Sequence, residues 1–284
     1  ASISSSNEHS SITNLSHQGS DGFRVTNSEL GLDVKDHLLD AELCYKFIGN
    51  GINRDLVNNK RLLNDKNVVF LFHGGTIGNL AVATSDISCF DNWVQYCPDD
   101  CIYIIIDRPG YFNSRNLIDT NIDNLCEKKE LLKSYLNYSS TGHADNPEEL
   151  DTDAVIGYSY KTFTNYIRAL ASYLDIEQFY VCGWSSGGPN ALACGYYLSD
   201  RVRGCIILSG DPDYKRAYQE DRLSVKSGPG ENVSELGIMN KIVKFNNFPP
   251  FPSPVGLGGY LEWIMERSGW QFDISQIRVP CLLL

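Results

Sequence analysis

The chain has 284 residues, 42% of them apolar, which is enough for one large α/β domain or two small ones. Its net charge of −11 at pH 7 argues against nucleic acid or an anionic membrane as a partner, because both favour clusters of Lys and Arg. No apolar run approaches the roughly 18–20 residues of a membrane-spanning helix. We therefore expect a soluble protein.

The N-terminal segment differs in composition from the rest of the chain. Its first 22 residues hold eight serines and no apolar run typical of a signal peptide. We therefore predict a disordered tail over residues 1–25. The nine cysteines show no CxxC or Cys/His spacing, so we predict no metal site and a reduced, cytoplasmic setting.

Strand-like and helix-like segments alternate from residue 41 onward. Several strand-like segments are continuous apolar runs, typical of strands buried on both faces of a parallel sheet. A helix over 163–174 shows apolar residues at helical spacing, and Ser159 or Thr162 could cap it. The alternation predicts an α/β fold, a mostly parallel sheet with helices on both faces. The expected strands cover 41–51, 68–72, 101–106, 178–182 and 203–210, and further helices are expected at 78–96 and 186–198.

Two stretches interrupt this alternation. Residues 116–157 contain no clear strand, and 145–153 carries five acidic residues in nine positions, so we predict a solvated insertion there. Residues 212–272 combine helix-like segments with a Pro/Gly-rich stretch, which indicates an inserted helical cap. We expect a core over 26–211 that resumes as a strand within 273–284.

The segment VCGWSSGGPNALAC, residues 181–194, predicts a strand that turns sharply into a helix, with Ser185 at the bend. Such a turn exposes the serine hydroxyl above the sheet and makes it a candidate nucleophile. Gly183 and Gly187 have no side chain that could clash with the turn. The alternative interpretation is an ordinary Gly/Ser-rich loop between a strand and a helix.

A second segment, VFLFHGGTIGN over 69–79, predicts a strand that ends in His-Gly-Gly beside this turn. The backbone N–H groups of Gly75 and Ser186 are therefore candidates for binding an oxyanion. We interpret His73 as a residue that fixes the loop, since it comes at a strand end well before Ser185 in the chain.

The order HGGT, DRPGYFNS (107–114) and VCGWSSGGPNALA resembles the α/β-hydrolase superfamily. It is most similar to a branch with a GWSGGGPxALA turn and a DRPGYGxS turn, and the likeness covers about 40–115 and 155–284. The resemblance implies an α/β-hydrolase fold in which Asp107 and Arg108 fix a turn. Ser186 replaces a glycine of that branch, and we expect the change to be harmless because the N–H matters more than the side chain.

In this superfamily the catalytic acid and then the histidine follow the serine along the chain. All five histidines here precede Ser185. The resemblance therefore implies that the sequence is C-terminally truncated, with the final strand and helix missing, and that the 284-residue piece is inactive. The alternative is a short protein that is inactive or uses another base. Asp211 or Asp213 could supply the acid, although Asp-Pro-Asp is also good turn chemistry.

These features predict a serine hydrolase acting on a small ester, amide or related acyl substrate through a covalent acyl-enzyme, without a cofactor. The alternatives are a non-catalytic ligand-binding protein of the same fold, or a cofactor-free perhydrolase or C–C hydrolase. Trp184, beside the nucleophile, is a candidate for substrate binding. The partner is expected to be a small molecule, and the sequence makes no prediction of oligomeric state.

Overall fold

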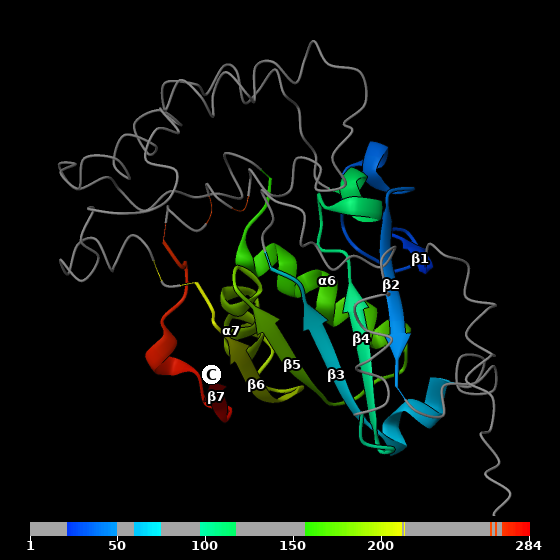
Figure 1. The fold of residues 1–284 in the computed structure, drawn as a ribbon. Coiled ribbons are helices and arrows are strands. Elements are labelled where there is room, and N and C mark those ends of the chain that lie inside the picture. The colour runs from blue at the N-terminus through cyan, green and yellow to red at the C-terminus, as the bar shows by residue number, and fades with distance from the viewer. Residues whose placement is uncertain are drawn as a thin grey trace, which may run out of the picture.

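The structure is a computed structural model that describes residues 22–49, 60–74, 97–117, 157–211, 213, 262, 265 and 269–284. Within these ranges, seven strands form one sheet in the order β1-β2-β4-β3-β5-β6-β7 (Figure 1). β1 and β2 are antiparallel to their neighbours, and the other five strands are parallel. The strands are β1 (Phe23–Thr26), β2 (Glu42–Ile48), β3 (Asn67–Phe72), β4 (Cys101–Ile106), β5 (Phe179–Trp184), β6 (Val202–Leu208) and β7 (Cys281–Leu283).

Two α-helices, α6 (Tyr160–Tyr173) and α7 (Gly187–Tyr197), pack on one face of the sheet and against each other (Figure 1). Ser159 caps α6, since its hydroxyl accepts a hydrogen bond from the Thr162 N–H at 3.1 Å. The helix expected at 78–96 lies outside the described residues. Short 3-10 helices cover Asp36–Leu38 (η2), Lys60–Asp65 (η3), Phe112–Leu117 (η4) and Ile274–Gln276 (η6).

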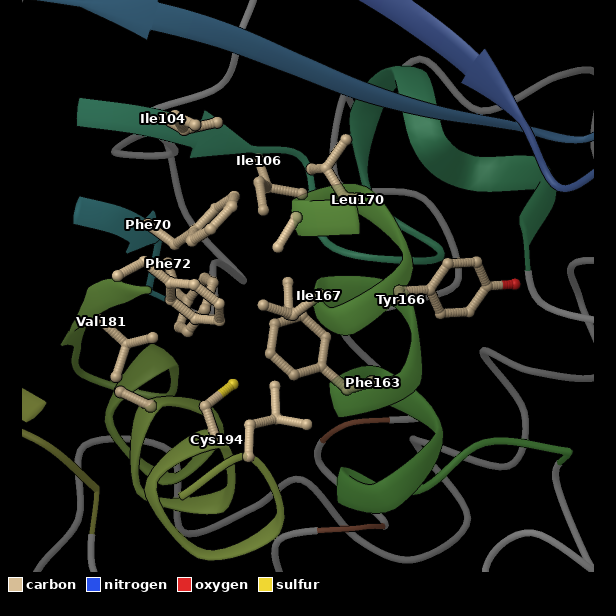
Figure 2. Close-up of a cluster of buried hydrophobic side chains, with 14 of the residues drawn as sticks. Phe70, Phe72, Ile104, Ile106, Phe163, Tyr166, Ile167, Leu170, Val181 and Cys194 are labelled. Carbon is tan, nitrogen blue, oxygen red and sulfur yellow. The ribbon is translucent and has the colours of Figure 1, made fainter. Parts of the chain in front are cut away.

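Alternate side chains of β3 enter two separate apolar clusters, which explains why the strand is a continuous apolar run. Phe70 and Phe72 face the helices, where the Phe72 ring meets the edge of Phe163 with 4.9 Å between ring centroids. Figure 2 shows these strand residues meeting α6 and α7. Val69 and Leu71 belong to the cluster on the opposite face. The predicted α/β fold with a mostly parallel sheet is therefore confirmed.

The N-terminal boundary of the core differs from the prediction. Phe23–Thr26 forms the edge strand β1, so the core begins before residue 26, and a tail over 1–25 is too long. The Phe23 ring stacks on Tyr45 and meets the edge of Phe47, both with centroids 5.6 Å apart. This short strand escaped detection because it is a strand through its pairing with β2, and four residues carry little pattern of their own.

The chain returns to the sheet within residues 273–284, where β7 begins at Cys281, directly after Pro280. Pro280 has no N–H to donate, and its carbonyl accepts a hydrogen bond from Cys205 N–H at 2.9 Å. The insertion at 116–157 and the cap at 212–272 lie mostly outside the described residues and stay predictions. Where the chain is described, no helix is both long and apolar enough to cross a membrane.

Candidate active site

The predicted turn between strand and helix is present. β5 ends at Trp184 and α7 begins at Gly187, and between them Ser185 has φ = 53°, in the left-handed region that non-glycine residues rarely adopt. The Ser185 N–H donates to the Leu208 carbonyl at 3.0 Å, and the Ser185 carbonyl accepts from Gly188 N–H at 2.8 Å. The neighbouring strand and the helix start therefore hold this strained residue from both sides.

Both glycines predicted to permit the turn are in close backbone contacts. A Cβ atom on Gly183 would lie 2.1 Å from the Gly187 carbonyl oxygen, and one on Gly187 would lie 2.4 Å from the Phe72 carbonyl oxygen. Backbone atoms so close to these positions leave room for glycine alone. The glycines thus let α7 start directly against the ends of β3 and β5.

The side chain of Ser185 is half-buried, and Trp184 beside it is 40% exposed. The Ser185 hydroxyl makes no hydrogen bond to any residue within the described ranges. An accessible hydroxyl held in a strained turn is suited to attack a substrate. A role for Trp184 in substrate binding stays a prediction.

The end of β3 approaches the turn as the sequence predicted. A Cβ atom on Gly74 would lie 3.2 Å from the Cβ of Ser185, so the His-Gly segment runs directly beside the candidate nucleophile. Gly75, the predicted donor of one oxyanion hydrogen bond, lies outside the described residues. Ser186, the predicted second donor, is buried at the start of α7.

His73 uses both ring nitrogens within the protein. Nδ1 lies 2.8 Å from the Gly74 carbonyl oxygen, and Nε2 accepts a hydrogen bond from Arg108 N–H at 3.2 Å. This pattern puts the proton on Nδ1. Burial, together with the nearby Arg108 charge, holds the pKa of His73 well below its ordinary value. These contacts agree with a loop-fixing residue and not with a base for Ser185.

A buried charged cluster lies beneath the turn, and sequence reasoning missed its main component. Arg108, fully buried, forms an ion pair with Glu262 at 2.5 Å. The Tyr111 hydroxyl donates to the other Glu262 carboxylate oxygen at 2.5 Å. Burial raises the pKa of Glu262, while Arg108 and Tyr111 act in the opposite direction. Glu262 stands in the predicted cap, 154 residues from Arg108, and no local pattern distinguishes it from a surface acid.

Arg108 also contacts Ser186, the first residue after the candidate nucleophile. Its Nη2 donates to the Ser186 hydroxyl at 3.1 Å, and its Nη1 lies 3.4 Å from the Ser186 carbonyl oxygen. The predicted turn-fixing role of Asp107 is supported as well, since its carboxylate accepts from Asn113 N–H at 3.3 Å. The turn after β4 is thus fastened to the start of α7.

Asp211 and Asp213 both follow β6. The Asp211 N–H donates to the Ser185 carbonyl at 3.1 Å, so this backbone adjoins the turn. Whether either carboxylate acts as the catalytic acid stays a prediction. In the described ranges, no group of three or more His, Cys, Asp or Glu side chains could hold a metal ion.

Several solved structures resemble this chain. A hydrolase from Pseudomonas aeruginosa shares 12% identity and a TM-score of 0.43, over 89% of this chain and 77% of its own. An enol-lactonase from Burkholderia xenovorans shares 14% identity and a TM-score of 0.40, over 85% and 76%. A bromoperoxidase from Bacillus anthracis shares 16% identity and a TM-score of 0.37, over 85% and 76%. At these values the likenesses carry no argument about function.

A comparison with curated proteins found no match. The sequence model of the alpha/beta hydrolase fold family, in contrast, matches residues 67–232, more than half of the chain. The matched region includes the segment after β3, the turn after β4 and the strained turn at Ser185. The chain belongs to the alpha/beta hydrolase fold family.

Proposed function

We propose that the protein is a serine hydrolase in which Ser185 attacks a small ester, amide or related acyl substrate. Family membership supports an enzyme of the α/β-hydrolase type, but a fold does not name its chemistry. The observation that carries the proposal is the backbone of Ser185, a non-glycine residue at φ = 53° between a buried strand and a helix. Such strain is retained where the surrounding structure enforces it, and it concentrates at functional sites.

In the proposed reaction, the Ser185 hydroxyl oxygen bonds to the substrate carbonyl carbon while its proton passes to a general base. The carbonyl oxygen becomes an oxyanion, which the N–H groups of Ser186 and Gly75 stabilise. The alcohol or amine then leaves with a proton, and water releases the acyl group from Ser185. The hydrogen bonds on both nitrogens of His73 argue that this histidine is not the base.

A fluorophosphonate probe tests the proposal, because it phosphonylates activated serines, whose oxygen displaces fluoride from phosphorus. We expect the intact protein to be labelled and Ser185→Ala to abolish labelling. Ser209→Ala is the matched control: Ser209 also follows a sheet strand with a positive φ of 45°, and it is exposed, but its hydroxyl has no proposed role. Labelling that survives Ser185→Ala would place the nucleophile elsewhere, and an unlabelled intact protein would favour ligand binding without turnover.

A further inference from the structure

The side chain of Ser186 makes an unexpected contact. A serine at the N-cap of a helix normally accepts a hydrogen bond from an N–H of the first turn. Ser186 occupies the N-cap of α7 but makes no such bond. Its hydroxyl instead accepts from Arg108 Nη2 at 3.1 Å, and the side chain is buried.

The backbone does not require serine at this position. Ser186 has φ = −61° and ψ = −13°, values that most residues adopt freely. The hydroxyl is therefore the distinguishing feature of the residue, and its partner is a charged donor in a buried setting. Charge-assisted hydrogen bonds of this kind are roughly twice as strong as neutral ones.

Further contacts hold the same residue. The Ser186 carbonyl accepts from the Asn190 side-chain amide at 3.0 Å and lies 3.4 Å from Arg108 Nη1. Glu262 in turn holds Nη1 at 2.5 Å, and the Arg108 guanidinium lies 4.8 Å from the centre of the Tyr111 ring. The guanidinium is thus fixed on two sides, and it can transmit that rigidity to Ser186.

We propose that the Ser186 hydroxyl, held by the buried Arg108–Glu262 pair, is a positioning group that aims the Ser186 N–H at the oxyanion. The inference rests on the proposed function, since the oxyanion forms only when Ser185 attacks a carbonyl. The proposal departs from the expectation that serine in place of glycine is harmless here. A donor aimed in advance stabilises the transition state without reorganising during the reaction, so the benefit falls on kcat and not on KM.

The test measures fluorophosphonate labelling rates, together with kcat and KM for a p-nitrophenyl ester, in the intact protein. Ser186→Ala should lower the labelling rate and kcat about tenfold with little change in KM, less than the loss when an oxyanion donor is removed outright. Ser186→Thr, which keeps the hydroxyl, should restore most of the rate. Ser159→Ala is the matched control, a buried serine that caps α6: it should lower the melting temperature and leave both rates unchanged.

A double-mutant cycle shows whether Glu262 influences Ser186. If Glu262 acts on Ser186 through Arg108, then Glu262→Gln should slow labelling in the wild type but add little in Ser186→Ala. Wild-type rates in Ser186→Ala, or fully additive effects in the cycle, would overturn the inference while leaving Ser185 as nucleophile. Labelling that does not depend on Ser185 would overturn the proposed function itself.

Discussion

Two turns meet at the candidate nucleophile, and different interactions stabilise them. The turn after β5 relies on small residues and backbone contacts, with Gly183 and Gly187 admitting backbone atoms at distances that exclude any side chain. The turn after β4 relies on buried charge: Arg108 binds Ser186 and Glu262, which lie 78 and 154 residues further along the chain. The first turn therefore depends on glycines that are visible in the local sequence, whereas the second depends on charged side chains that meet only in the assembled fold.

The largest effect should come from breaking the buried ion pair. Glu262→Leu leaves Arg108 charged and buried, so we expect a loss of about 3–5 kcal/mol in the free energy of unfolding. Urea denaturation measures it. The double variant Arg108→Met/Glu262→Leu should lose less than the single one, because no charge remains buried without its partner. A double variant that is less stable than Glu262→Leu alone would contradict this account.

The stability of the turn after β5 should be nearly as sensitive to one added methyl group. In Gly183→Ala the added Cβ meets the Gly187 carbonyl oxygen at 2.1 Å, and we expect a loss of about 3 kcal/mol in urea denaturation. Gly31→Ala is the control, since Gly31 has φ = 65° with no atom within 4 Å of an added Cβ. Its cost should be only that of a left-handed alanine, about 1 kcal/mol. A loss in Gly183→Ala no larger than that in Gly31→Ala would contradict the claim that the close backbone approach excludes a side chain at Gly183.

The buried His73, which lies beside Arg108, should also make the free energy of unfolding depend on pH. Burial and the Arg108 charge lower the pKa of His73, so the unfolded chain binds a proton below about pH 6.5 that the folded protein does not. The free energy of unfolding should therefore fall as the pH drops below about 6.5, because protons then bind to the unfolded chain and not to the folded protein. His73→Gln should lack this contribution in urea titrations at each pH, and a wild-type slope retained by the variant would refute it.

The smallest effect concerns the strain at Ser185. Glycine adopts φ = 53° without a steric penalty, so Ser185→Gly should be about 1 kcal/mol more stable than Ser185→Ala. Both variants lack the hydroxyl, so the difference between their melting temperatures reports the cost of the backbone conformation alone. A Ser185→Gly variant no more stable than Ser185→Ala would mean that the turn is not strained.

Much of the fold could be predicted because the decisive signals are local. Continuous apolar runs identified β3 and β4, since each strand packs on both faces. The turn at Ser185 was equally predictable, because glycine is required wherever backbones approach closely. The edge strand Phe23–Thr26 was missed for the converse reason, since pairing with β2 and not its own pattern makes it a strand.

The sequence by itself determined the parallel sheet, the family and the turn that contains the strained serine. Apolar periodicity and the glycines that a tight turn requires can both be recognised in short segments of sequence. Only the tertiary structure decided which polar side chains meet beneath that serine. Arg108, Ser186 and Glu262 are polar residues that would suit the surface equally well. Their ion pair and hydrogen bond depend on burial and on distances of about 3 Å, which exist only after the strands have assembled.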